Sequence, residues 1–306
     1  MKRKEEPAEA LLTRKPAEET CLLKEGFLSA LYVPEADIYP GKAMILVGGS
    51  DGYFSLTKLI AEQYAGRGLT ILALAYWAAE GLPTAMSRIP LEYAEKAALW
   101  LRDRGYEKIG MMGISMGAEY TLLCASYLPE LISCTVAINP ICICSQGIQK
   151  KNQWHKKMQL LPGSAFSFRG KDLPYGKLTF QKGSILRDSL RRKEICLRSC
   201  YEKAVETAGE DTMIPAEKIS GAVLLLAAEQ DAMWPSAESA EKLIKQREIH
   251  GLKTEYCHYT YASHFLLPYR LKSRRIFAVE RKYPDECEKS NLEAFQKILA
   301  FLRINW

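Results

Sequence analysis

The alternation of apolar and amphipathic segments constrains the fold of this chain more than any other feature. Nearly uninterrupted apolar runs occur at residues 42–52, 69–77 and 131–140, and segments with helical periodicity lie between them. Such runs are typical of strands buried on both faces of a parallel sheet. Helices between them return the chain for the next parallel pairing. The sequence therefore predicts an α/β fold, with a mostly parallel central sheet and helices on both faces.

This pattern breaks after residue 140 and resumes near residue 221. Residues 141–215 are polar, basic and rich in Gly, Pro and Lys, so we expect them to leave the sheet as a cap insertion or a long loop. An apolar run at 221–231 predicts a further strand. We assign residues 26–306 to one domain, and residues 1–25 to an N-terminal extension that is frayed or helical.

The stretch GISMGAE, at residues 113–119, lies between a predicted strand and a predicted helix. Its Gly-x-Ser-x-Gly pattern is that of a nucleophile elbow, the sharp turn that presents a serine at the edge of an α/β-hydrolase sheet. Gly113 and Gly117 give the strand and the helix room to approach each other. Ser115 is therefore the candidate nucleophile, and the α/β-hydrolase fold is the predicted fold class. The alternative is a serine in a tight turn without chemistry.

Two backbone amides are expected to stabilise an oxyanion beside Ser115. One belongs to Met116, at the start of the following helix. The other should come from the loop GGSDG after an earlier strand, with Gly49 as the preferred donor and Ser50 as its alternative. A phosphate-binding loop is disfavoured because the stretch lacks the Lys and hydroxyl ending of a P-loop.

A serine needs a base, and the chain has four histidines. His264 follows the last predicted strand, which is where the base of an α/β-hydrolase lies. His258 falls inside that strand, His155 precedes the resumed strand, and His250 ends a helix, where a cation is favourable. His264 is therefore the predicted base.

The acid should follow the strand at 221–231, where Glu229 and Asp231 both qualify. Asp231 lies farther into the loop and is preferred, with Glu229 as the alternative. Its role would be to orient the His264 ring and stabilise its protonated form. Glu119, four residues after the serine, is instead expected to support the elbow or to be solvated.

The composition excludes several other classes of protein. The net charge of +6 is spread along the chain, apart from the start MKRKEE and a stretch from Lys150 to Lys193, and it lacks the dense basic module of nucleic acid-binding proteins. Nine cysteines without a regular framework predict reduced thiols and a cytoplasmic protein. Their spacing does not match a zinc site, and we expect neither a metal nor an organic cofactor. No apolar run reaches the length of a membrane span.

Several segments resemble the C-terminal catalytic domain of acyl-CoA thioesterases and bile acid-CoA:amino acid N-acyltransferases. They include LVGGSDG, LALAYWAAEGLP, GISMGAE, IPAEKISG and HFLLPY, and the resemblance covers residues 41 to 306 in order. It implies Ser115 as nucleophile, Asp231 as acid and His264 as base. Amidating members of the family resemble cysteine enzymes, so the serine here favours hydrolysis. Animal members carry a β-sandwich before this domain, for which the forty residues here are too few.

Together these features predict a serine hydrolase that cleaves a small-molecule acyl thioester, such as an acyl-CoA. A carboxylesterase, peptidase or lactone hydrolase with the same triad, and a non-catalytic binding protein on a hydrolase scaffold, remain alternatives. The 141–215 segment is expected to shape the acyl pocket. Its aromatic residues line the pocket or anchor the insertion, and its lysines contact coenzyme A phosphates or water. The aromatic residues are Trp154, Phe166, Phe168 and Tyr175, and the lysines are Lys150, Lys151, Lys156 and Lys157.

Overall fold

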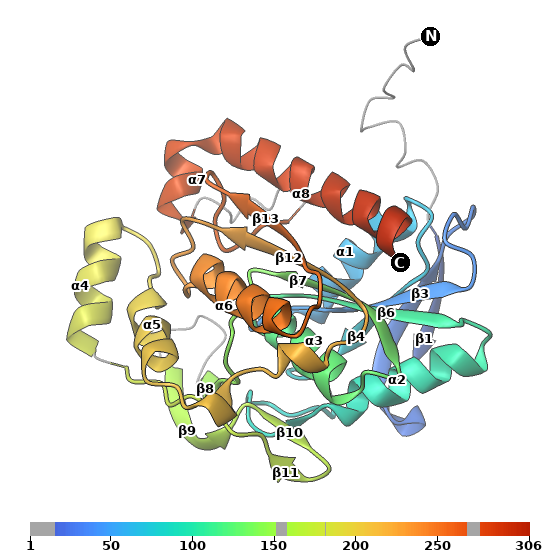
Figure 1. Ribbon diagram of the computed structural model, residues 1–306, viewed down its shortest axis with the longest axis horizontal. Coiled ribbons are helices and arrows are strands. Elements are labelled where there is room, and N and C mark those ends of the chain that lie inside the picture. The colour runs from blue at the N-terminus through green and yellow to red at the C-terminus, as the bar shows by residue number, and fades with distance from the viewer. Residues whose placement is uncertain (1–15, 151–157, 181, 268–275) are drawn as a thin grey trace.

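The computed structural model describes residues 16–150, 158–180, 182–267 and 276–306 (Figure 1). The predictions made for Trp154, His155 and the three lysines at 151, 156 and 157 therefore lie outside the described residues.

A twisted central sheet of eight described strands forms the middle layer of the molecule (Figure 1). The strands are β1 (Ala17–Cys21), β2 (Leu28–Val33), β3 (Lys42–Val47), β4 (Ile71–Ala75), β6 (Lys108–Ile114), β7 (Ile132–Ile138), β12 (Ala222–Ala228) and β13 (Glu255–Tyr259). Their order is β1-β2-β4-β3-β6-β7-β12-β13. From β4 to β13 all neighbours are parallel, whereas β1 and β2 add an antiparallel edge. The predicted mostly parallel sheet is confirmed.

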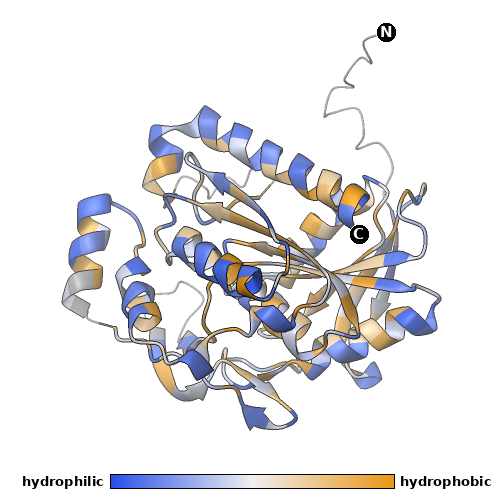
Figure 2. Cartoon of the chain, viewed as in Figure 1, coloured by the Kyte–Doolittle hydropathy of each residue, from blue (hydrophilic) through white to orange (hydrophobic). Residues whose placement is uncertain are grey.

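Helices cover both faces of this sheet, as the alternation predicts. They are α1 (Phe54–Ala65), α2 (Glu92–Asp103), α3 (Met116–Tyr127), α6 (Ser236–Ile249) and α8 (Pro284–Asn305), and the short helix α7 (Ala278–Lys282) packs against α8. The apolar residues of α1 and α8 pack in the core on one face, and those of α2, α3 and α6 pack in the core on the other. The hydropathy colouring shows the apolar residues concentrated in the central strands (Figure 2).

Strand β3 shows why continuous apolar runs form this layer. Ala43, Ile45 and Val47 belong to the core on the α2 and α3 side, and Met44 and Leu46 belong to the core on the α1 and α8 side. Because successive side chains of a strand point to opposite faces, a strand covered on both faces needs apolar residues at every position.

The described part of the N-terminal extension contains a strand that the prediction did not include, followed by the short 3-10 helix η1 (Leu23–Glu25). Ala17–Cys21 is neither frayed nor helical but forms the edge strand β1, which pairs antiparallel with β2. Four of its five residues are exposed. A strand of which only Cys21 is buried needs no apolar periodicity, so its sequence, AEETC, carries no strand signal.

Residues 141–215 form a folded layer rather than a loop. They contain β8 (Gln146–Lys150), β9 (Met158–Ser164), β10 (Phe166–Phe168), β11 (Lys171–Asp172), α4 (Lys182–Arg192), α5 (Arg198–Glu206) and η2 (Glu210–Thr212). β10 also pairs with the short strand β5 (Ile89–Pro90). Every residue of α3 from Met116 to Ser126 is buried, because the sheet lies on one side of this helix and the segment covers another.

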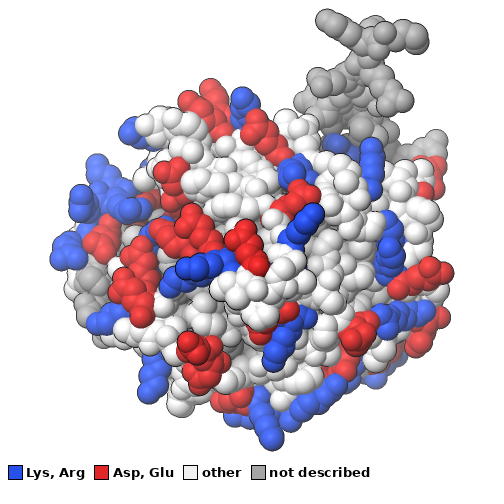
Figure 3. All heavy atoms as spheres, viewed as in Figure 1, with Lys and Arg blue, Asp and Glu red and all other residues white. Residues whose placement is uncertain are grey.

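Charged side chains of both signs are spread over most of the face shown in Figure 3. Each of the nine cysteines lies in the described residues as a free thiol, and eight of them are buried. In the described parts of the chain, no helix is both long enough and apolar enough to cross a bilayer.

Candidate active site

Three side chains from three different loops form a hydrogen-bonded row at the carboxyl edge of the sheet. The Oγ of Ser115 lies 2.7 Å from Nε2 of His264. The Nδ1 of the same ring lies 2.9 Å and 2.8 Å from Oδ1 and Oδ2 of Asp231. All three residues are buried. The structure therefore brings together the three residues that the sequence proposes as nucleophile, base and acid.

Close backbone contacts explain both glycines of the elbow. Ser115 connects β6 to α3 with φ 58° and ψ −126°, a left-handed conformation that is strained for a residue with a Cβ. A Cβ at Gly113 would lie 2.0 Å from the carbonyl oxygen of Gly117. A Cβ at Gly117 would lie 2.3 Å from the carbonyl oxygen of Gly48, in the loop after β3. Only glycine fits at both positions, and the turn thereby presents the Ser115 hydroxyl to the cavity.

The loop after β12 holds Asp231 in place and leaves Glu229 outside the site. Oδ1 of Asp231 accepts hydrogen bonds from the backbone amides of Met233, at 2.8 Å, and Trp234, at 3.3 Å. Glu229 is exposed, and its backbone amide donates to Tyr259 of the neighbouring strand. Two amide donors and the His264 ring thus converge on Asp231, and the geometry favours it over Glu229.

Asn139 is a site residue that the sequence reasoning missed. It directly follows β7, is fully buried, and has a φ of 49°, which asparagine tolerates better than most residues. Its amide donates to the carbonyl oxygen of His264 at 2.9 Å and accepts from the backbone amide of Ala228 at 2.8 Å. Its own carbonyl accepts from the Trp234 indole. Asn139 therefore ties the base loop to the acid loop, and a polar residue directly after a buried strand was the available signal.

The predicted oxyanion loop lies against the nucleophile. A Cβ at Gly49 would lie 3.4 Å from the Cβ of Ser115. The Tyr76 hydroxyl donates to the carbonyl of Gly48, and the Trp77 indole donates to that of Gly49. In a trans peptide the next N–H points the opposite way, so the amides of Gly49 and Ser50 point away from these two aromatic rings.

Met116 supplies the other expected donor. As the first residue of α3, it has a backbone N–H without an acceptor inside the helix, at the positive end of the helix dipole. Met116, Gly49 and Ser50 all line the same cavity as Ser115. The arrangement offers amide donors to a negative charge that develops beside the serine.

Two other histidines lie where the sequence places them. His258 is part of β13 and is exposed. His250 caps the end of α6, with its Nδ1 2.9 Å from the carbonyl oxygen of Gln246. Neither contacts Ser115.

Glu119 is buried beneath the nucleophile, one turn into α3. Its two carboxylate oxygens accept hydrogen bonds from Ser145, one from the backbone amide at 2.6 Å and one from the hydroxyl at 2.7 Å. Burial raises the pKa of Glu119 to about 8, and the bonds from Ser145 oppose that rise. Of the two roles expected for Glu119, a solvated carboxylate is excluded. It instead joins the elbow helix to the start of the 141–215 segment.

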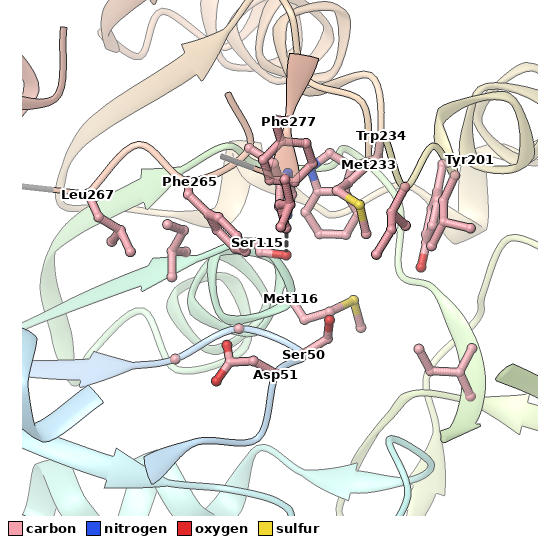
Figure 4. A pocket seen from close by; sticks show the side chains of 18 of the residues that line it. Ser50, Asp51, Ser115, Met116, Tyr201, Met233, Trp234, Phe265, Leu267 and Phe277 are labelled. Carbon is pink, nitrogen blue, oxygen red and sulfur yellow. Dashed lines mark hydrogen bonds between the residues drawn. The ribbon is translucent and has the colours of Figure 1, made fainter. Parts of the chain in front are cut away.

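A cavity of about 1020 Å³ opens at the nucleophile and is lined mainly by apolar side chains. Figure 4 shows Phe265 and Leu267 on one side of Ser115, and Tyr201, Met233 and Trp234 on the other. The described residues that line it are Gly48, Gly49, Ser50, Asp51, Leu56, Thr57, Ile60, Ile114, Ser115, Met116, Ile148, Gln159, Phe180, Ile185, Leu186, Ser189, Ile195, Leu197, Tyr201, Met233, Trp234, His264, Phe265, Leu267, Ile276 and Phe277.

The 141–215 segment contributes to this cavity through residues other than those predicted. Phe166 is buried against Tyr120, Phe168 packs on Tyr127, and the Tyr175 hydroxyl accepts from the Gly163 amide. These three aromatic residues anchor the segment and do not line the cavity. Its lining residues come instead mainly from β8, β9, α4, α5 and the connections between them.

Comparison with known proteins decides the family. Residues 89–303 match the family model described as BAAT / acyl-CoA thioester hydrolase C terminal. The chain belongs to this family. Acyl-coenzyme A thioesterase 6 of Mus musculus is 30% identical over 254 residues, covering 80% of this chain and 54% of the relative. Acyl-coenzyme A thioesterase 1 of Mus musculus is 26% identical over 240 residues, covering 77% and 50%. The chain spans about half the length of the curated relatives that it matches.

Solved structures share the fold of this family member at low sequence identity. An α/β hydrolase from a deep-sea metagenome library has a TM-score of 0.56 and 15% identity, covering 94% of this chain and 97% of that one. The acylaminoacyl peptidase of Pyrococcus horikoshii has a TM-score of 0.56 and 11% identity, covering 99% and 44%. The predicted α/β-hydrolase fold is confirmed.

Proposed function

We propose that this protein is a serine hydrolase that cleaves acyl-CoA thioesters. The row formed by Asp231, His264 and Ser115, at the floor of an apolar cavity, carries the proposal. The thioesterase relatives support the choice of a thioester, because their names state that they act on acyl-coenzyme A.

The reaction follows from the positions of these groups. Ser115 Oγ attacks the thioester carbonyl carbon while His264 Nε2 takes its proton. The amides of Met116 and Gly49 stabilise the resulting oxyanion, an effect of about 3 kcal/mol per donor. When the C–S bond breaks, His264 returns the proton to the leaving thiolate. A water, deprotonated by His264, then attacks the carbonyl carbon of the acyl-enzyme. As the bond from that carbon to Ser115 Oγ breaks, His264 gives the proton to Oγ, which releases the carboxylic acid and the free serine.

A carboxylic ester is the second candidate substrate, because none of the described residues that line the cavity is Lys or Arg. A described lining of this kind suits an ester of an uncharged alcohol as well as the acyl part of a thioester. Parallel turnover of acyl-CoA and p-nitrophenyl esters by the purified protein separates the two substrates. Negligible thioesterase activity beside rapid ester hydrolysis would reverse our choice.

Labelling by a fluorophosphonate probe tests the nucleophile itself. We expect the wild-type protein to label and the Ser115→Ala variant not to label. Ser189→Ala, which changes another hydroxyl that lines the same cavity, is the matched control and should still label. A wild-type protein that never labels would favour a binding protein on a hydrolase scaffold.

A further inference from the structure

Helix α4 stands at the mouth of the cavity with an apolar strip facing outward. Ile185, Leu186 and Ser189 line the cavity, and Leu186 is also 61% exposed. A residue that lines the cavity and is also exposed to solvent lies at the rim of the cavity. Leu190, one turn after Leu186, lies outside the cavity and is 68% exposed. The apolar lining therefore continues over the rim onto the outer surface of α4.

The same rim is apolar beyond the helix. Ile195 and Ile276 line the cavity and are exposed as well. Single exposed apolar residues are ordinary, but a group of them contiguous with an apolar cavity marks an interaction surface. We call Leu186, Leu190, Ile195 and Ile276 the rim patch.

Positively charged side chains surround the rim patch, and the acidic side chains beside them are less exposed to solvent than they are. Arg187, Arg191, Arg192 and Lys193 are exposed on α4 and directly after it, and Lys and Arg gather over α4 at the left of Figure 3. The side chain of Arg192 is 47% exposed but that of its partner Glu194 only 4%, and Arg187 is 76% exposed beside Asp188 at 24%.

Arg281 of α7 extends this positive charge toward the other side of the mouth. Its guanidinium donates to the carbonyl oxygens of Ile276 and Lys193, at 2.7 Å each. The cations thus flank the rim patch on both the α4 side and the α7 side.

We propose that the rim patch docks on an anionic lipid surface, with α4 lying in the interface. A basic helix with exposed leucines beside its arginines binds such surfaces by burying its apolar strip and pairing its cations with lipid headgroups. Docking places the open mouth against the acyl chains, so a membrane-dissolved acyl compound enters the cavity without crossing water. The docking does not depend on the hydrolase activity, and it is measured without turnover.

Cosedimentation of the full chain with vesicles tests the docking. We expect binding to phosphatidylcholine vesicles that contain phosphatidylserine, weaker binding to phosphatidylcholine alone, and weaker binding at high salt. Leu190→Ser should lower the partition coefficient about ten-fold through lost apolar burial. Arg187→Gln with Arg191→Gln should lower it about five-fold per cation.

Helix α6 supplies matched controls, because it contributes no residue to the cavity lining. Ile249, 74% exposed, and the exposed Lys245 lie there, and Ile249→Ser and Lys245→Gln should bind vesicles as the wild type does. Unchanged thermal unfolding and fluorophosphonate labelling show that each variant is folded. A wild-type protein that does not bind the anionic vesicles, or α6 variants that lose as much binding as α4 variants, would overturn the proposal. Self-association that Leu190→Ser abolishes, without vesicle binding, would assign the rim patch to a second copy instead.

Discussion

At the elbow, the backbone of α3 packs so closely on the backbone of the loop after β3 that no Cβ fits at Gly117. At the other side of the same cavity, α4 contacts α5 and leaves Leu186 and Leu190 more than half exposed. The first region holds the reacting groups in a single arrangement. The second supplies apolar surface whose details can vary. The reacting groups thus lie in a part of the chain that tolerates few substitutions, whereas α4, which lines the cavity, lies in a part that tolerates more.

The largest effect is expected at the acid of the row. Asp231→Asn should lower kcat about 10⁴-fold, because the amide favours the wrong tautomer of His264. Glu229→Gln, two residues earlier and exposed, should change kcat less than about two-fold. Steady-state kinetics on a thioester measure both, and equal losses in the two variants would contradict the assignment of Asp231.

Two glycine substitutions test the contrast in packing directly. Gly117→Ala should destabilise the protein by at least about 3 kcal/mol, because its Cβ would meet backbone oxygen atoms that cannot move aside. Gly183→Ala, in α4, should stabilise it by about 0.5 kcal/mol, because the added Cβ would meet no other described part of the chain within 4 Å and alanine favours the helix. Urea unfolding gives both values, and a tolerated Gly117→Ala would break the comparison.

Glu119 joins the elbow helix to Ser145, at the start of the segment that contains α4, and its raised pKa predicts a pH dependence of stability. The pKa rises from 4.5 to about 8 on folding, so the folded state binds more protons between these values. The stabilisation by the neutral carboxyl is complete below about pH 4.5 and is lost as the pH rises toward 8, with a slope of at most about 1.4 kcal/mol per pH unit.

Glu119→Gln should remove this slope from the free energy of unfolding. Glu95→Gln is the matched control: its hydrogen bonds with Arg169 lower the pKa of Glu95, so its titration lies below this window. Urea unfolding at several pH values compares the variants. A wild-type protein and a Glu119→Gln variant with parallel stability profiles would show that the carboxylate is ionised throughout.

The smallest effect is expected within the 141–215 segment. Phe180 lines the cavity, so Phe180→Ala should raise KM for a long-chain substrate about five-fold and leave kcat nearly unchanged. Phe168→Ala should instead lower thermal stability and leave KM unchanged, because Phe168 packs on Tyr127 outside the cavity. A change of kcat in the first variant would mean that the segment also positions the reacting carbonyl.

The sheet and the row of site residues were predictable because each leaves a local signal. Strands covered on both faces are apolar at every position, and a strained turn without space for Cβ atoms requires Gly113 and Gly117. The order of Ser115, Asp231 and His264 along the parallel strands then places them at one edge.

The remainder depends on contacts between segments that are distant in sequence. The exposed residues of β1 carry no periodicity, and its pairing with β2 is set by the sheet. Glu119 is buried against Ser145, and the role of Asn139 depends on Ala228 and His264, which lie 89 and 125 residues away. A pattern within a short stretch of sequence does not indicate such contacts. For the same reason the strands and helices within residues 141–215 were not predicted.

The pairing of β3 with β6 also bears on where the catalytic domain begins in this chain. The family match begins at residue 89, after β2, β3 and β4, yet β3 is the neighbour of the strand that carries the elbow. A fragment excised at that boundary would lose four of the eight described strands of the sheet, β1 to β4, and would expose the apolar edge of β6, which is prone to aggregation. The segment that matches the family model is therefore shorter than the segment that forms the complete sheet.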